Sequence, residues 1–446
     1  MVPESCRSDF ADAGIGMTGR QQVRPSRAAP GVAITLLLLF LLFEYLRLHE
    51  IVPILGALKV QTATSAALLL IVIAETAKGS VRLARQSWLL LAFLGLTAFT
   101  ILVAYNQFRA YQFAYGLTLT LIAYFVITHF LHNERDLKRF LAVLLGIHMY
   151  LAVKGIRGYS RATFDRYGYT STGQVGGSFL GDENDVALAM VVILPLAIYL
   201  FRQSRSLPGR ILWGAGSVLI LLTIIFTFSR GGFVGLTVML LYSVATSQNK
   251  AKAVGGLVLA AAILIAVAPS QYWARMETIK DPASGTAQLR RNYWAAARRM
   301  FYDSPIWGVG GNNFGVLLPD YAIEFEPERR PNQWGRASHS MYFDLLAEFG
   351  LLGVLLIGSV LLWNFRDLRH VMRLTKQGAC STSMGQLAHS LRLSWVGFLV
   401  PAAFLSVLSY PHLYYLTALT VVARDLASAD EGAITTEPVA ALEKVA

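Results

Sequence analysis

The sequence predicts an all-α polytopic membrane protein with about twelve membrane-spanning helices and one large extracytoplasmic loop. Hydrophobic residues make up 55% of the 446 residues and charged residues only 15%, with a mean hydropathy of +0.49. A soluble chain of this size needs far more charge to cover its surface. Apolar runs of about 17 to 25 residues recur along the chain, and each can cross a hydrocarbon core of roughly 30 Å.

The spans form two groups. Nine fall within residues 31–269 and three within residues 339–426, with the large loop at residues 270–338 between them. Lys59 and Gln61 interrupt the second span, and Pro53 marks the turn before it. The predicted spans are 31–48, 54–74, 87–105, 112–131, 137–153, 183–201, 211–228, 231–246, 253–269, 339–363, 391–409 and 411–426.

Both ends of the chain are polar. Residues 1–30 contain no apolar run like that of a cleavable signal peptide, so the first apolar segment is expected to remain as a helix after a cytoplasmic tail. Residues 427–446 are rich in Ala, Glu and Thr and predict a disordered cytoplasmic tail. Cys6 and Cys380 both fall in segments expected in the cytoplasm and match no Cys/His metal spacing, so neither a disulfide nor a metal site is implied.

The distribution of basic residues predicts the orientation. Alternate short loops are basic, and the positive-inside rule places them and both termini in the cytoplasm. The net charge of +12 does not indicate a nucleic-acid partner, because no basic stripe is interleaved with exposed aromatics. The long outer segments 154–182 and 270–338 escape the rule, so their arginines need another explanation: Arg157, Arg161 and Arg166, then Arg275, Arg290, Arg291, Arg298, Arg299, Arg329, Arg330 and Arg336.

Arg230 lies between the seventh and eighth spans, in "FTFSRGGFVGL". An arginine at a membrane boundary commonly snorkels to the headgroups. Arg230, however, is on the less basic side and is followed by Gly231 and Gly232. Two glycines permit close backbone packing and leave amide N–H groups for an anion. The residues alone leave both interpretations open.

The large loop contains a predicted helix. Residues 292–301 include no helix breaker, and the helix is expected to end at Asp303. Arg290 and Trp294 then share one helical face at i, i+4. The glycines at 308, 310 and 311 permit a tight backbone path, but no strand precedes them and they do not complete a dinucleotide-binding spacing.

Polar residues also mark the starts of the sixth and tenth spans. Asp182 is the expected N-cap of the sixth, and capping does not account for Asn184, which is suited to bind a sugar hydroxyl. His339 begins the tenth span in "HSMYFDLLAEFGLLG", where Ser338 or Ser340 can cap the helix. From position alone, a boundary histidine is more often a packing residue than a catalyst. Glu348, within the apolar run, needs a partner or a proton.

Four elements, in this order, resemble the O-antigen ligase superfamily of bacterial inner-membrane glycan ligases and polymerases. They are Ser-Arg-Gly-Gly at 229–232, Arg-x-x-x-Trp at 290–294, "DSPIWGVGGNNF" at 303–314 and "HSMYFDLLAEFGLLG" at 339–353. The resemblance covers residues 180–360 well and the remainder only as hydropathy. "GDENDVALA" is also similar to the branch of exosortase-associated O-glycosylation ligases.

The resemblance implies a GT-C-like glycosyltransferase of the bacterial inner membrane with its active site facing the periplasm. Such enzymes move a glycan from undecaprenyl diphosphate to an acceptor hydroxyl, without a metal or another cofactor. By position in the motifs, His339 is implied to be catalytic, and Arg230 and Arg290 to bind the diphosphate. Other candidate substrate-binding residues, with no secure counterpart in the family, are Arg161, Asn184, Arg291 and Arg336.

The chemistry agrees with that assignment. Arginines can stabilise a departing diphosphate in place of Mg²⁺, and a histidine near pKa 6.5 is suited to accept the acceptor's proton. Direct attack on C1 inverts its configuration.

The acceptor is expected to be lipid A-core, but a growing polysaccharide or a protein Ser or Thr remains open. A transporter or lipid flippase is the alternative from another class; it predicts charges at mid-span and discontinuous helices related by symmetry, whereas the polar residues here gather at one face.

Overall fold

The computed structural model describes residues 29–46, 48, 52–79, 83–160, 180, 182–247, 249–280 and 285–443. All regular secondary structure in these residues is helical. The prediction of an all-α protein is therefore confirmed for this part of the chain.

A helix occupies each of the twelve predicted spans. Eight of the described helices are long and apolar enough to cross a membrane, and residues 31–46 and 230–246 form shorter apolar helices. These lengths and compositions confirm a multi-pass membrane protein, while the count of twelve crossings stays a prediction. The helices are α1 (Ala29–Leu46), α4 (Val60–Ala77), α5 (Arg85–Val103), α6 (Gln107–Phe130), α7 (Glu134–Ser160), α8 (Glu183–Gln203), α9 (Leu207–Phe226), α10 (Arg230–Thr246), α11 (Lys250–Val267), α15 (Met341–Lys376), α16 (Thr382–Ala402) and α17 (Pro411–Glu443).

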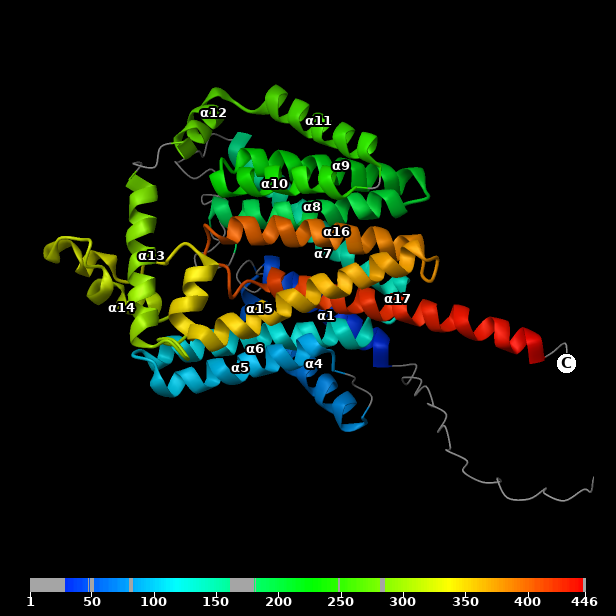
Figure 1. The fold of residues 1–446 in the computed structure, drawn as a ribbon, viewed down its shortest axis with the longest axis horizontal. Coiled ribbons are helices and arrows are strands. Elements are labelled where there is room, and N and C mark those ends of the chain that lie inside the picture. Colours follow the sequence, from blue (N-terminus) through cyan, green and yellow to red (C-terminus); the bar gives the residue numbers. More distant parts are fainter. Residues whose placement is uncertain are drawn as a thin grey trace, which may run out of the picture.

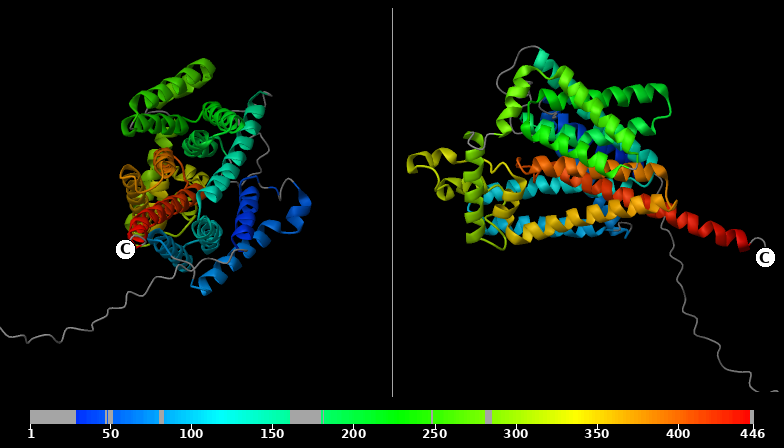
Figure 2. Two further views of the ribbon diagram at one scale, coloured as in Figure 1. Left: turned by 90° about the vertical axis from the view of Figure 1, so that its right-hand side faces the viewer. Right: turned by 45° about the horizontal axis from the view of Figure 1, so that its top comes forward.

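The helices form one bundle, and burial differs sharply across it (Figures 1 and 2). In α8, 78% of the most apolar window is buried, because α9, α10 and α16 pack around it. In α11, none of the corresponding window is buried, and this helix lies at the outer edge of the bundle (Figure 1). An apolar helix without protein cover suits a lipid-facing position.

Two segments differ from their predicted form. The second span, expected at 54–74, is divided into a short helix α3 (Pro53–Ala57) and α4, because Lys59 adopts a left-handed conformation with φ +49°. At the other end of the chain, α17 continues to Glu443 and so includes most of the segment 427–446 that was expected to be disordered. Ala, Leu and Glu in this segment are good helix formers.

Helix α15 is broken near its start. Gly350 has φ +57° and ψ −155°, so the regular helical hydrogen bonds stop there. The glycine-containing segment 305–310 fills the gap and pairs with the exposed backbone groups. Four hydrogen bonds join the two segments: Leu351 N to Pro305 O (2.8 Å), Leu352 N to Ile306 O (3.0 Å), Val309 N to Ala347 O (2.9 Å) and Gly310 N to Glu348 O (3.0 Å).

The large loop folds over one end of the bundle. Its elements are α12 (Ser270–Glu277), η1 (Thr278–Lys280), α13 (Gly285–Asp303), α14 (Phe314–Tyr321), η2 (Pro327–Arg329) and η3 (Pro331–Gln333). Helix α13 runs across the ends of the bundle helices (Figures 1 and 2), and it contains the helix predicted at 292–301. The same end receives the α5–α6 turn, where Asn106 N donates to Asn313 Oδ1 at 2.8 Å.

Candidate functional site

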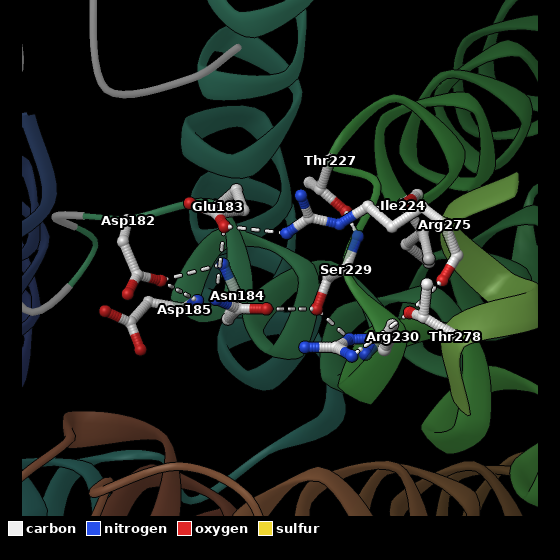
Figure 3. Close-up of polar contacts among 11 residues, drawn as sticks. Asp182, Glu183, Asn184, Asp185, Ile224, Thr227, Ser229, Arg230, Arg275 and Thr278 are labelled. Carbon is white, nitrogen blue, oxygen red and sulfur yellow. Dashed lines mark hydrogen bonds and ion pairs between the residues drawn. The ribbon is translucent and has the colours of Figure 1, made fainter. Parts of the chain in front are cut away.

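The Ser-Arg-Gly-Gly element begins α10 and is fixed against α8. Ser229 is the N-cap, and its hydroxyl accepts a hydrogen bond from Gly232 N (3.1 Å) while it donates to Asn184 Oδ1 (2.7 Å; Figure 3). A Cβ at Gly232 would lie only 2.6 Å from Cβ of Ala187, so a glycine is needed for α10 to approach α8 this closely. These contacts hold Arg230 at the first position of α10.

The start of α8 lies beside the start of α10 and is fixed by its own N-cap. Asp182 is its N-cap, as predicted, and Oδ1 accepts from the backbone N–H groups of Asn184 (2.7 Å) and Asp185 (3.0 Å; Figure 3). The Asn184 side chain, predicted as a sugar contact, instead has protein partners, because its carbonyl accepts from Ser229 and its NH2 group donates to Glu183 Oε1 at 3.4 Å. Asn184 therefore joins α8 to the Arg230 turn.

Three arginines from three different helices lie near the start of α8. Arg230 of α10 donates from Nη1 to Thr278 Oγ1 (3.2 Å), and Arg275 of α12 pairs through Nη2 with the buried Glu183 carboxylate (3.3 Å; Figure 3). Arg290 of α13 completes the group, which we call the arginine cluster: Arg230, Arg275 and Arg290. Among the described residues, the buried Nε atoms of Arg275 and Arg290 have no hydrogen-bond partner.

The guanidiniums of the arginine cluster lie close enough to repel one another. Burial lowers the pKa of the Arg290 guanidinium, and the nearby Arg230 lowers it further, against a smaller opposing effect of Asp182. Guanidinium groups that repel each other and have spare N–H donors are suited to bind a multivalent anion.

His339 lies next to the cluster, in the turn before α15. Its backbone is left-handed, with φ +54°, and its N–H donates to Ser406 Oγ at 3.1 Å. Helix α13 contacts the same turn, because Trp294 Nε1 donates to Ser338 O (3.1 Å) and the Tyr293 ring stacks near the imidazole with centroids 6.5 Å apart. The helix that presents Arg290 thus also positions His339.

The environment lowers the pKa of His339. Burial is the largest cause, followed by the charge of Arg290; Arg336 acts in the same direction and Asp182 opposes them. The lowered pKa favours the neutral imidazole, which can accept a proton.

A cavity of about 220 Å³ lies beside the His339 turn. Arg109, Trp334, Arg336, Asp344, Glu348 and Ser406 contribute to its lining. The Glu348 carboxylate, for which the sequence predicts a partner or a proton, accepts from Phe314 N at 3.0 Å, and the Asp344 carboxylate interacts with the hydroxyls of Ser338 and Ser406. Two buried carboxylates thus lie close to the turn that carries His339.

Residues 215–358 match the family model described as O-antigen ligase. Over these residues, about a third of its length, the chain is similar to the O-antigen ligase family. No curated protein matches the chain. The resemblance predicted from the sequence is thus confirmed at the level of the superfamily, with a ligase- or polymerase-type role in glycan transfer. The finer branch stays a prediction.

The matched O-antigen ligase segment contains Arg230, Arg275, Arg290 and His339. Of the other candidate residues, Arg336 lies near His339 and lines the cavity, whereas Arg291 is exposed on α13 and donates to Gln288. Arg161 and Arg166 lie outside the described residues. Ser340 occupies the N-cap position of α15, but no capping hydrogen bond from its side chain is present.

Sequence reasoning gave no role to Arg275, Arg109 or Asp344. Arg275 is one of the arginines of segment 270–338 that the positive-inside rule does not explain, but no motif assigned it a function. Among the described residues, no three His, Cys, Asp or Glu side chains are grouped as metal ligands.

Proposed function

We propose that this protein transfers a glycan from undecaprenyl diphosphate to an acceptor hydroxyl on lipid A-core, at the periplasmic face of the bacterial inner membrane. The observation that carries the proposal is the arginine cluster beside a histidine of lowered pKa, inside the segment that matches the O-antigen ligase family.

The arginine cluster is suited to hold the diphosphate of the donor. Negative charge builds on the bridging oxygen as the sugar C1–O bond breaks, and cations aimed at that oxygen stabilise the transition state. Each charge-assisted hydrogen bond contributes about 1.5–3 kcal/mol. Arg230 and Arg290 take this role in the proposal. Arg275, already paired with Glu183, adds positive charge and positions the base of the loop.

His339 accepts the proton of the acceptor hydroxyl. The acceptor oxygen forms a bond to C1, the bond from C1 to the diphosphate oxygen breaks, and its electron pair leaves with undecaprenyl diphosphate. The hydroxyl proton goes to the imidazole, which later releases it to water. Attack from the face opposite the leaving group inverts the configuration at C1. A histidine whose neutral form is favoured suits this step.

A transporter or flippase is less well supported. That reading predicts discontinuous helices related by symmetry. Among the described helices, α15 carries a break at Gly350, but segment 305–310 of the same chain already pairs with its backbone. The break therefore anchors the large loop, which favours a fixed site at one end of the bundle.

Purified protein tests the proposal directly. The enzyme in detergent is mixed with its lipid-linked glycan donor and with glycolipid, glycoprotein and polysaccharide fractions from cells that lack the gene. We expect glycan to appear on the glycolipid fraction with release of an equal amount of undecaprenyl diphosphate. Transfer to protein or to polysaccharide instead would replace lipid A-core as the acceptor. A wild-type protein that transfers no glycan to any fraction contradicts the proposed activity.

A further inference from the structure

The cavity beside His339 is separate from the arginine cluster. Its lining comes from α6, α14, α15 and the loops at 312–313, 334–337 and 406–409, and none of it from α8, α10, α12 or α13. It nevertheless reaches the catalytic turn, because Ala337 and Ser406 line it and Ser406 binds the backbone N–H of His339. The cavity and the arginine cluster are thus different sites that both lie next to His339.

The cavity has a buried acidic side and an exposed basic side. Asp344 and Glu348 are only 8% and 6% exposed. Arg336 and Trp334 lie in the open, and the guanidinium of Arg109 stands 5.6 Å from the centre of the Trp334 ring. Within the described ranges, neither Arg109 nor Arg336 forms an ion pair. The exposed side therefore offers positive charge that the protein itself does not neutralise.

Resting on the proposed function, we propose that this cavity binds the acceptor, and that the accepting sugar carries an anionic substituent, a phosphate or a carboxylate, which Arg109 and Arg336 bind. The volume of about 220 Å³ is below the ~300–1,000 Å³ typical of pockets that enclose drug-sized ligands, so it suits a single sugar residue. The exposed indole of Trp334 offers an apolar face to the ring, and the buried carboxylates can accept hydrogen bonds from its hydroxyls.

The polarity of the cavity orients such a sugar. Its anionic group stays near the two guanidiniums, because opposite charges attract and the buried side of the cavity offers no positive charge. Its hydroxyls then face the buried side, next to the turn that carries His339. The donor diphosphate and the acceptor anion would thus be held by separate arginines, and neither would compete for the other's site.

Steady-state kinetics with the purified enzyme test this. The acceptor is the fraction that the wild-type enzyme glycosylates, used untreated, after dephosphorylation with hydrofluoric acid, or after carbodiimide-mediated reduction of its carboxylates. For Arg109→Gln and Arg336→Gln we expect KM for the acceptor to rise about tenfold or more, as for the loss of one charge-assisted hydrogen bond, with KM for the donor unchanged. Lysine at either position should restore part of the affinity.

The treated acceptors identify the anion. Loss of wild-type affinity after dephosphorylation assigns a phosphate, and loss after carboxylate reduction assigns a carboxylate; in either case the treated acceptor should no longer distinguish wild type from the glutamine variants. Arg329→Gln is the matched control, since Arg329 is on the same loop, is exposed and does not line the cavity.

Four results would overturn the inference. An unchanged acceptor KM in both glutamine variants would exclude an anionic group on the acceptor as the ligand of the cavity. Equal use of all three acceptors by the wild type would exclude it as well. Both results leave the proposed function intact. A rise in the donor KM alone assigns the two arginines to the donor. A wild-type enzyme without transfer activity removes both proposals together.

Discussion

Two polar clusters occupy opposite ends of the same helical bundle, and they differ in how their charges are balanced. In the network at the end away from the large loop, Asp367 Oδ2 accepts from Gln86 Nε2 (2.7 Å) and from Arg424 Nη1 (3.1 Å), and Arg424 also contacts Asp425 (2.6 Å). One guanidinium is shared by two carboxylates. In the arginine cluster, Arg275 forms an ion pair with Glu183, whereas Arg230 and Arg290 form no ion pair in the described residues.

The difference separates a structural cluster from a binding site. Buried polar groups that are hydrogen-bonded to one another connect helices, as Asn364 Nδ2 does in the first cluster by donating to Thr417 Oγ1 at 3.0 Å. Guanidiniums that are held close to one another cost free energy in the empty protein, and an anionic ligand can recover it. We therefore expect substitutions in the two clusters to have opposite signatures, one in kinetics and one in stability.

His339→Ala gives the largest expected effect. Removing the general base should lower kcat about 10²–10⁴-fold, while membrane insertion and the KM for the donor stay near wild type. Single-turnover transfer and donor binding are measured on the same detergent-purified protein. Normal transfer by a well-folded His339→Ala enzyme would rule out the catalytic role.

Arg290→Gln should show the kinetic signature of the arginine cluster. Loss of a buried, charge-assisted contact to the diphosphate should reduce kcat/KM for the donor about 10- to 150-fold, with Arg230→Gln behaving similarly. Arg298→Gln is the control on the same helix, because Arg298 is exposed. Equal effects of the Arg290 and Arg298 substitutions would mean that the cluster does not bind the donor.

Asp367→Asn should show the opposite signature. Arg424 would lose a buried partner, which should lower the free energy of unfolding by about 1–3 kcal/mol, while the kinetics of the folded enzyme remain unchanged. Thermal unfolding in detergent measures the first and transfer rates the second. Asp425→Asn, at a carboxylate 56% exposed, should cost less than about 1 kcal/mol. A change in kcat without a change in stability would refute the structural assignment of this network.

Local patterns in the sequence were sufficient for part of this picture. Hydropathy predicted the helical spans, and short motifs singled out Arg230, Arg290 and His339, because both signals act over a few residues. The ion pair of Arg275 with Glu183 joins residues 92 positions apart, so no local pattern indicates it. The helix break at Gly350 could not be predicted from the apolar run that contains it, because the break depends on hydrogen bonds with segment 305–310.

The smallest expected effect tests how closely the cavity and the catalytic turn are linked. Because Arg336 lowers the pKa of His339, Arg336→Gln should raise that pKa. A general base must be neutral, so kcat falls as the pH drops through its pKa. The acid side of the pH profile should therefore move to higher pH. Saturating donor and acceptor remove the effect on binding, and Arg329→Gln should leave the profile unchanged. A profile that stays in place or moves to lower pH would show that the charge of Arg336 does not reach the imidazole during turnover.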